Sequence, residues 1–329
     1  MDLISLLSKI CFPNWPLDLV GLVLDYSAFG TTMFFFARDH PDGSIITPTI
    51  VSSAINSTSL RTGRLEFTRQ YLQPHHWEVP TFPAIIRLDA RIYLSGGGPH
   101  PHWCYDLGTQ ELTRAPAMSQ SREAHSIVKL PHDHSFMVIG GLEYRQWGPR
   151  RLESCEVYNT LTRKWSDAVQ LSSPRSEHAS VLLNGYIYVL GGVLNPGIIS
   201  SSCERYNIKT KQWESIAPLA EPRCLMAVVT IGTDSILVLG GWNDSTLDSI
   251  EEYRPSTNTW RTCTWTLPQP RRRFGVVYDD ISRLLTICGG LVASPPCSPV
   301  LSRSQPFAST KWLESTTFTI PSSFGYCSL

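Results

Sequence analysis

The sequence lacks an excess of charge of either sign. Its 329 residues include 28 basic and 28 acidic side chains, so the formal net charge is zero. Charged residues make up 17% of the chain, below the roughly 25% of an average globular domain. A broadly basic nucleic-acid-binding surface needs a surplus of Lys and Arg, and an acidic tail needs a surplus of Asp and Glu. We therefore expect no nucleic-acid partner.

Long uninterrupted apolar segments and secretion signals are also missing. No run of 18 uncharged apolar residues occurs, so we expect no membrane span and no membrane partner. Asp2 stands where a secretion signal carries basic residues, and Asp18 and Asp25 interrupt the first apolar stretch. The nine cysteines are scattered without a Cys-x-x-Cys pair, which is typical of buried free thiols in a reducing compartment. These features predict a protein of the cytoplasm or nucleus.

Motifs that carry catalysis are absent as well. The chain has no Gly-x-Ser-x-Gly, no phosphate-binding loop and no dinucleotide fingerprint. His100, His102 and Cys104 alternate as strand ligands of a metal would, but no second cluster with a defined spacing accompanies them. We predict a protein that is not an enzyme and that binds no metal and no cofactor.

What the sequence does contain is an internal repeat. Five glycine doublets each follow a short apolar run (IYLS, FMVI, IYVL, ILVL and LTIC). The doublets are Gly96-Gly97, Gly140-Gly141, Gly191-Gly192, Gly240-Gly241 and Gly289-Gly290, at offsets of 44, 51, 49 and 49 residues.

Two further markers recur in phase with the doublets. The first is an aromatic residue with a large residue seven positions later: Tyr105/Leu112, Tyr158/Trp165, Tyr206/Trp213 and Tyr253/Trp260. The second is an arginine ten or eleven residues beyond that pair: Arg122, Arg175, Arg223 and Arg271.

Each period has the pattern of about four short strands. A run such as IYVL is apolar throughout, as expected of a strand buried on both faces. Asn184-Gly185 before it is a strong signal for a two-residue hairpin. The polar residues between Tyr158 and Trp165 indicate a turn between two strand ends, whose aromatics pack on a neighbouring sheet. Four strands repeated at about 50 residues are typical of a β-propeller blade.

This pattern resembles the Kelch repeat. The fullest copies are SCEVYNTLTRKW and SCERYNIKTKQW, and the resemblance covers about residues 80–329. We therefore predict an all-β protein, a six-bladed Kelch β-propeller with a short N-terminal helical segment. The expected blades are about 29–79, 80–121, 122–174, 175–222, 223–270 and 271–329. The first blade is degenerate, so a five-bladed ring with a separate N-terminal region remains the alternative. The sequence leaves open which terminus closes the ring.

Residues 1–28 do not fit the repeat. Apolar residues at helical spacing predict an amphipathic helix over Pro16–Tyr26. Trp15–Tyr26 also resembles the first helix of an F-box, although the two further helices of an F-box do not follow. One interpretation is a helix packed across the propeller. The other is a helix that docks a Skp-type adaptor through Pro16, Leu19, Val20, Val23 and Leu24.

The resemblance to Kelch-like ubiquitin-ligase adaptors also implies a site at the propeller mouth. It places there Arg122, Arg175, Arg223 and Arg271, with Tyr144, Arg145, Trp147, Asn195, Trp242 and Asn243 from the loops after the glycine doublets. A ring of arginines near aromatics suits a peptide that bears carboxylates. The alternative for each arginine is a structural hydrogen bond to loop carbonyls, and for Trp242 it is packing against the next blade.

The favoured function is therefore protein recognition. The propeller would hold a peptide degron or another partner segment, as the substrate-recognition adaptor of a ubiquitin ligase. A second class is a Kelch scaffold subunit of a larger assembly without a ligase link. A third, a Kelch enzyme that processes sugars, lacks an evident acid–base constellation.

Overall fold

The computed structural model describes residues 17–27, 30–39, 47–55, 67–71, 84–96, 102–109, 111–131, 134–146, 148–279, 284–288, 291–292 and 316–319. Every regular element within these ranges is a β-strand. This confirms the all-β class. No helix in the described part has the length and apolar character to cross a membrane.

The strands form a series of antiparallel sheets, and within each of the larger sheets neighbouring strands lie in the order in which they occur in the sequence. The first sheet contains β1 (Leu17–Ser27), β2 (Gly30–Asp39), β3 (Thr47–Ile55) and β4 (Phe67–Tyr71). The second contains β5 (Ala84–Leu88), β6 (Arg91–Ser95), β7 (His102–Asp106) and β8 (Glu111–Arg114). The third contains β9 (Ser126–Lys129), β10 (Ser135–Ile139), β13 (Cys155–Asn159) and β14 (Lys164–Ala168).

Three further sheets complete the series within the described residues. The fourth contains β16 (Ala179–Leu183), β17 (Tyr186–Leu190), β20 (Cys203–Asn207) and β21 (Gln212–Ile216). The fifth contains β22 (Ala227–Ile231), β23 (Ser235–Asn243), β24 (Ser245–Arg254) and β25 (Thr259–Thr262). The sixth contains β27 (Gly275–Asp279), β28 (Leu284–Cys288) and β30 (Thr316–Thr319).

Short strands lie at one end of these sheets. They are β11 (Leu142–Arg145) with β12 (Gly148–Arg151); β15 (Arg175–Ser176) with β18 (Val193–Leu194) and β19 (Ile198–Ile199); and β26 (Arg271–Arg272) with β29 (Leu291–Val292).

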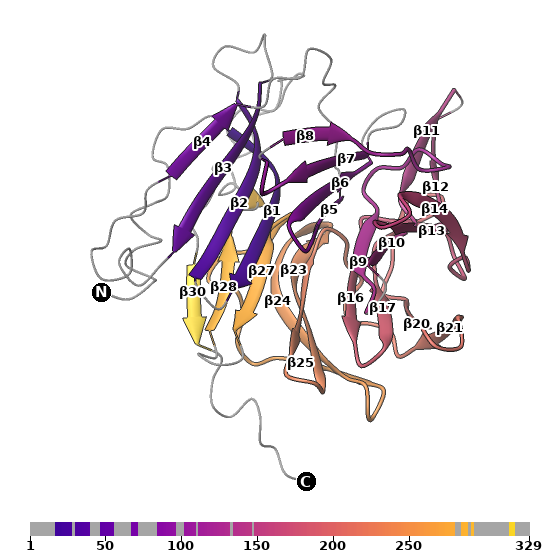
Figure 1. Ribbon diagram of the computed structural model, residues 1–329. Helices are drawn as coiled ribbons and strands as arrows, with labels where there is room; N and C mark the ends of the chain where they lie inside the picture. The colour runs from indigo at the N-terminus through magenta and orange to yellow at the C-terminus, as the bar shows by residue number, and fades with distance from the viewer. Residues whose placement is uncertain are drawn as a thin grey trace, which may run out of the picture.

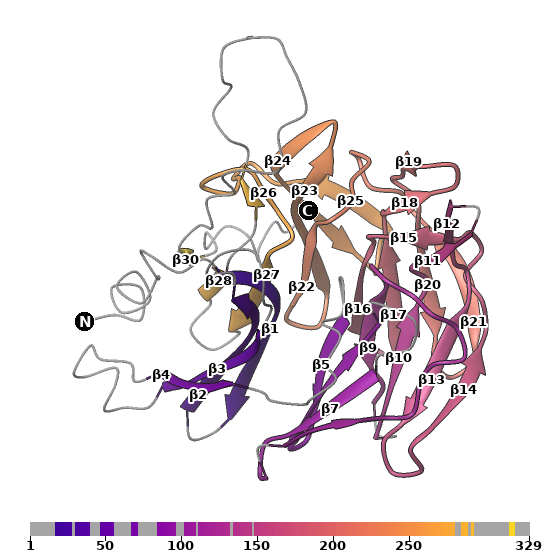
Figure 2. The ribbon, with the colours of Figure 1, turned by 90° about the horizontal axis from the view of Figure 1, so that it is seen from above.

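The first strands of the sheets contact one another in a closed cycle. β5 contacts β9, β9 contacts β16, β16 contacts β22, β22 contacts β27, and β1 contacts both β27 and β5. Figure 1 shows the sheets spread around this inner set, and Figure 2 shows the first sheet beside the sixth. This is the arrangement of a β-propeller. No sheet in the described part mixes strands from the two ends of the chain.

The apolar runs before the glycine doublets form strands, as predicted. Each is the second strand of one of the last five sheets. Ile187, Val189 and Leu190 in β17 are fully buried, as are the equivalent residues of β23. A strand covered by a neighbouring sheet on each face has no solvent side, so its sequence shows no alternation. The predicted hairpin is confirmed too, because Asn184 and Gly185 take φ angles of 51° and 77° and link β16 to β17.

The helix predicted over Pro16–Tyr26 is wrong, because residues 17–27 form strand β1. β1 pairs with β2, which contains Phe34–Phe36, and the register shifts between Leu19 and Gly21. Residues Leu19, Val20, Val23 and Leu24 lie in this strand, and Pro16 is outside the described residues. The segment has valines and alternating leucines that fit a strand as well as a helix. Pairing with β2 decided between them, since tertiary context overrides a weak local preference.

Aromatic rings fill the seam between the second and third sheets. His102 lies at the centre, with its ring centroid 4.6 Å from that of Tyr158 and 5.0 Å from that of Trp165. The carbonyl oxygen of Pro116 lies 2.8 Å from His102 Nδ1 and accepts the Trp165 indole N–H at 2.7 Å. His102 is therefore a core residue of the seam.

Burial of His102 predicts that stability falls in mild acid. Burial lowers the pKa of His102 to about 4, below the value of about 6.5 for an unfolded chain. The unfolded state therefore binds more protons, and the stabilisation present above about pH 6.5 is lost as the pH falls toward 4. The free energy of unfolding is measured by urea titration between pH 7 and pH 5. Its slope against pH should be smaller for His102→Gln than for the parent protein, by an amount that corresponds to about one proton.

The parent protein, unfolded in the same buffers, is the reference for this comparison. An equal slope for the parent protein and His102→Gln would contradict the prediction.

Candidate functional site

The four repeated arginines are buried inside their sheets. Arg122, Arg175, Arg223 and Arg271 are at most 1% exposed. Nη1 of Arg175 donates to the carbonyl oxygens of Gly191 and Ser202, both at 3.0 Å. Its Nη2 donates to Ser202 Oγ at 3.2 Å and to Glu204 Oε1 at 3.0 Å.

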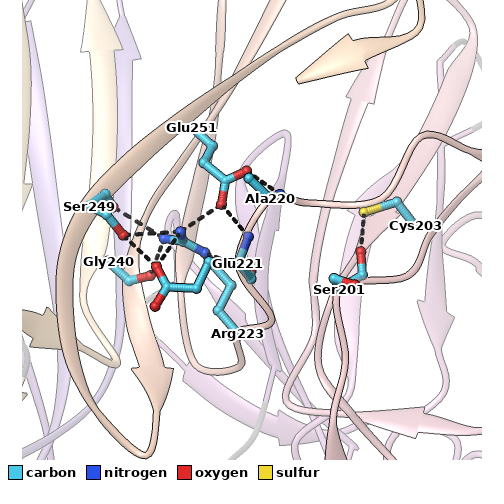
Figure 3. A network of polar contacts seen from close by, with 8 residues as sticks. All are labelled: Ser201, Cys203, Ala220, Glu221, Arg223, Gly240, Ser249 and Glu251. Atoms are coloured by element: carbon cyan, nitrogen blue, oxygen red, sulfur yellow. Dashed lines mark hydrogen bonds and ion pairs between the residues drawn. The ribbon is translucent and has the colours of Figure 1, made fainter. Parts of the chain in front are cut away.

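The same set of contacts recurs in the neighbouring sheets. Arg122 donates to the Gly140 and Ser154 carbonyls and to the Glu156 carboxylate. Arg223 donates to the Gly240 and Ser249 carbonyls at 3.0 and 3.1 Å and to Glu251 Oε1 at 2.7 Å (Figure 3).

Each glutamate also binds the backbone of the loop that precedes its arginine. The second carboxylate oxygen accepts a backbone N–H: Glu156 from Ser119 at 2.8 Å, Glu204 from Ser172 at 3.0 Å and Glu251 from Ala220 at 2.7 Å. The guanidinium groups of Arg122, Arg175 and Arg223 are thus held by carbonyls and a carboxylate of their own sheet. Of the two interpretations of the sequence, this geometry fits the structural one, and we do not place these side chains in contact with a partner.

The backbone of each arginine segment also joins neighbouring sheets. The Arg175 carbonyl accepts the N–H of Gly141 at 2.8 Å, and the Arg223 carbonyl accepts that of Gly192 at 2.9 Å. A Cβ on Gly192, which has a φ of 93°, would lie 2.7 Å from the Ser176 carbonyl oxygen. The glycine doublets are therefore required where two sheets meet at their ends.

Residues two positions after each arginine form an arc of backbone hydrogen bonds. Glu177 donates its N–H to the Ala124 carbonyl, Leu225 to Glu177 and Arg273 to Leu225, at 2.8, 2.9 and 2.9 Å. All four have left-handed φ angles between 48° and 56°, a conformation that non-glycine residues adopt when their surroundings impose it. The arc runs from the third sheet to the sixth.

Hairpins that follow the glycine doublets rise beside this arc. We call this end of the protein the mouth face, defined by the arc residues and the hairpins 142–151, 193–199 and 241–247. Tyr144 on β11 and Ile198 on β19 are large apolar side chains that are 65% and 61% exposed.

The other predicted loop residues have varied surroundings. Asn195 is exposed and precedes Pro196 at the tip of the β18–β19 hairpin, whereas Asn243 is half-buried. Arg145 pairs with Glu143 at 2.7 Å, and Trp147 lies outside the described residues.

Trp242 is half-buried and packs against a residue of the next repeat. The Arg272 guanidinium lies over its ring, 4.2 Å from the centroid, and Trp242 forms an isolated bridge with Cys224. Packing on the next repeat was the alternative we gave for this residue. Arg272 also keeps part of its side chain accessible, so the stacked pair belongs to the mouth face.

Sequence reasoning missed Arg272 and Arg273, although the run Arg271-Arg272-Arg273 was a signal. Nη2 of Arg273 lies 3.7 Å from Glu177 Oε1. The pKa of Arg273 is lowered overall. Burial is the main cause and Arg272 adds to it, whereas Glu177 acts in the opposite direction. Burial, followed by Glu177, raises the pKa of the neighbouring Cys224 thiol to about 12. Cys224 thus lies close to one acid and two arginines.

Metal-binding groups are not evident in the part of the chain that the structure describes. No cluster of three or more His, Cys, Asp or Glu side chains lies there in an arrangement that could hold a metal ion. Cys104, Cys155, Cys203, Cys224 and Cys263 are free thiols.

Comparison with known proteins agrees with this geometry. The profile of the KLHDC2/KLHL20/DRC7 Kelch-repeats domain matches residues 84–290. The chain is 27% identical over 243 residues to Kelch-like protein terF of Aspergillus terreus, covering 67% of this chain and 51% of that protein. It is 29% identical over 211 residues to mouse Kelch-like protein 35, covering 61% of this chain and 35% of that protein. The chain thus spans about half or less of these relatives.

The arginine network predicts a large loss of stability when one partner is removed. Arg175→Ala leaves the Glu204 carboxylate buried without its cation, which typically costs about 3–5 kcal/mol. Arg91→Ala is the control, because Arg91 forms an exposed pair with Asp106 at 3.1 Å, a type worth about 0–1 kcal/mol. Urea unfolding should separate the two variants, and equal losses would contradict the structural role of Arg175.

Proposed function

Since the chain belongs to the KLHDC2/KLHL20/DRC7 Kelch-repeats family, we propose that it is a protein-interaction module whose mouth face holds a segment of a partner protein. The six sheets serve as six blades, and the first strands that contact one another in a cycle line the centre. A ring of this kind presents one hairpin per repeat at the same end, so several small contributions sum into one site.

The observation that carries the proposal is the exposure of Tyr144 and Ile198. They lie on hairpins of successive sheets, at the end where the arc is formed. Large apolar side chains held on short hairpins lose little freedom on binding and bury a large area, which is why aromatic residues are enriched at interfaces. Arg272 on Trp242 adds a cation that is already oriented. These features suit a partner segment with apolar side chains and a carboxylate.

A finer proposal is that the partner is a ubiquitin-ligase substrate. It is supported by the resemblance of the repeat to that of Kelch-like ligase adaptors. Docking of a Skp-type adaptor by a helix at residues 15–26 is not part of it, because residues 17–27 are a strand.

The ligase proposal is tested with the intact chain, since deletion of residues 1–28 would remove β1 from its contacts with β5 and β27. Co-purification with a cullin-based scaffold is expected. A stoichiometric complex with a partner in which no ligase subunit is present would contradict this role and favour the scaffold alternative.

The binding face is tested by charge substitutions at its apolar tips. Affinity capture followed by quantitative mass spectrometry should show that Tyr144→Asp with Ile198→Asp loses the proteins that the parent chain retains, because the new carboxylates must be desolvated on binding. Leu161→Asp is the matched control, since Leu161 is 71% exposed in the turn between β13 and β14, at the opposite end of the third sheet.

The two variants must remain folded, which far-ultraviolet circular dichroism verifies. If Leu161→Asp loses the same proteins and the double variant keeps them, the assignment of the mouth face is wrong.

A further inference from the structure

The hairpin that presents Tyr144 has the least backbone support of the three on the mouth face. β11 and β12 form a two-stranded sheet, whereas β18 and β19 pair with β15, and the β23–β24 hairpin extends the fifth sheet. At the root of the β11–β12 hairpin, Leu142 and Glu123 exchange two backbone hydrogen bonds of 2.7 and 2.8 Å. Beyond that root, the direction of the hairpin depends on its side chains.

Glu143 ties this hairpin to the segment that precedes β9. The side chain is half-buried, and its Oε2 accepts hydrogen bonds from Arg145 Nε at 2.7 Å and from Gln120 Nε2 at 3.4 Å. Side chains alternate between the two faces of a strand, so Glu143 and Arg145 share one face of β11 and Tyr144 projects from the other. Holding the first face therefore sets the direction in which Tyr144 points.

Gln120 is in turn held by the buried arginine network. Its Oε1 accepts the hydroxyl of Ser154 at 2.6 Å, and Ser154 Oγ accepts Arg122 Nη2 at 3.2 Å. Every bond in this chain runs in the same sense, from the guanidinium of Arg122 to the carboxylate of Glu143, and hydrogen bonds in such a chain polarise one another. The side chain at position 120 must accept on one side and donate on the other.

The fifth sheet shows why this position needs an amide. Glu221 stands two residues before its arginine, as Gln120 does in the third sheet, and its Oε2 accepts Ser249 Oγ at 3.0 Å and the arginine Nη2 at 3.3 Å (Figure 3). A glutamate therefore fits the arginine side of the network. An ionised carboxylate has no hydrogen to donate, so it cannot bind a second carboxylate. In the fifth sheet, Asn243 has the position of Glu143.

We propose that Gln120 and Glu143 are positioning residues of the mouth face, which hold Tyr144 in the orientation that a partner segment binds. This inference rests on the proposed function and adds the residues that orient one of its contacts. Because the orientation is fixed before a partner arrives, less conformational freedom is lost on binding. Neither Gln120 nor Glu143 needs to touch the partner for this role.

The test swaps the donor and the acceptor of this contact in the full chain. Gln120→Glu keeps the acceptor for Ser154 but places two carboxylates together, so the hairpin should be released. Hydrogen exchange measured by mass spectrometry should show the amides of β11 and β12 exchanging about tenfold faster, the scale of one hydrogen bond to a charged group. The swapped pair, Gln120→Glu with Glu143→Gln, again has one donor and one acceptor and should return to the parent rate.

Binding is read with the proteins that the parent chain captures and that Tyr144→Asp with Ile198→Asp loses. Gln120→Glu should retain less of them, and the swapped pair should recover them. Gln212→Glu is the matched control, because Gln212 is exposed on β21 and its substitution adds the same charge. It should leave both hydrogen exchange and capture unchanged. Far-ultraviolet circular dichroism verifies that each variant is folded.

The outcomes separate this inference from the proposed function. Unchanged hydrogen exchange in Gln120→Glu overturns the inference alone, and so does faster exchange that the swapped pair does not reverse, since damage to the Arg122 network then explains it. Faster exchange with full capture shows that the orientation of the hairpin does not set binding, which also overturns it. If no captured protein depends on Tyr144 and Ile198, the proposed function fails, and the inference fails with it whatever the exchange rates are.

Discussion

The buried ion pair between an arginine and a glutamate of the same sheet is the interaction on which the repeats depend. Burying a guanidinium costs several kcal/mol unless its donors are paired. In Arg122, Arg175 and Arg223 both terminal nitrogens meet carbonyl, hydroxyl or carboxylate oxygens. The arrangement connects the segment before the first strand, the end of the second strand and the start of the third. It thereby fixes the relative positions of three pieces of chain that are far apart in sequence.

That connection positions the mouth face. Because the arginine side chain binds the first glycine of its own doublet and its carbonyl binds the second glycine of the preceding doublet, each sheet end is placed relative to its neighbour. The arc of Ala124, Glu177, Leu225 and Arg273 follows directly, since each is two residues from an anchored arginine. Rigid supports of this kind keep the accessible side chains in place before a partner arrives, which reduces the entropy lost on binding.

Much of the fold could be predicted from repeated copies, but the role of the arginines could not. Their spacing in the sequence is the same whether their side chains contact a partner or form structural hydrogen bonds within the sheet. The direction of each side chain depends on a glutamate about 30 residues later, as in Arg175 and Glu204. One signal was available in the sequence. The segment before β5 has no arginine, and Trp103 takes the position that Glu156, Glu204 and Glu251 hold in the next three sheets. The repeated arginine and the glutamate are thus both present in the third, fourth and fifth sheets and both missing in the second, as expected of two residues that pair.

The sequence by itself determined the period, the apolar strands before the glycine doublets, and the cross-strand pairs Tyr158–Trp165 and Tyr206–Trp213. These follow from local preferences repeated in phase. The tertiary structure alone decided that residues 17–27 are a strand, that four arginines are buried, and that Glu177 lies beside Arg273. Each of these depends on contacts between sheets, where the energy of an ionic or backbone pairing exceeds the small preference that any single segment carries.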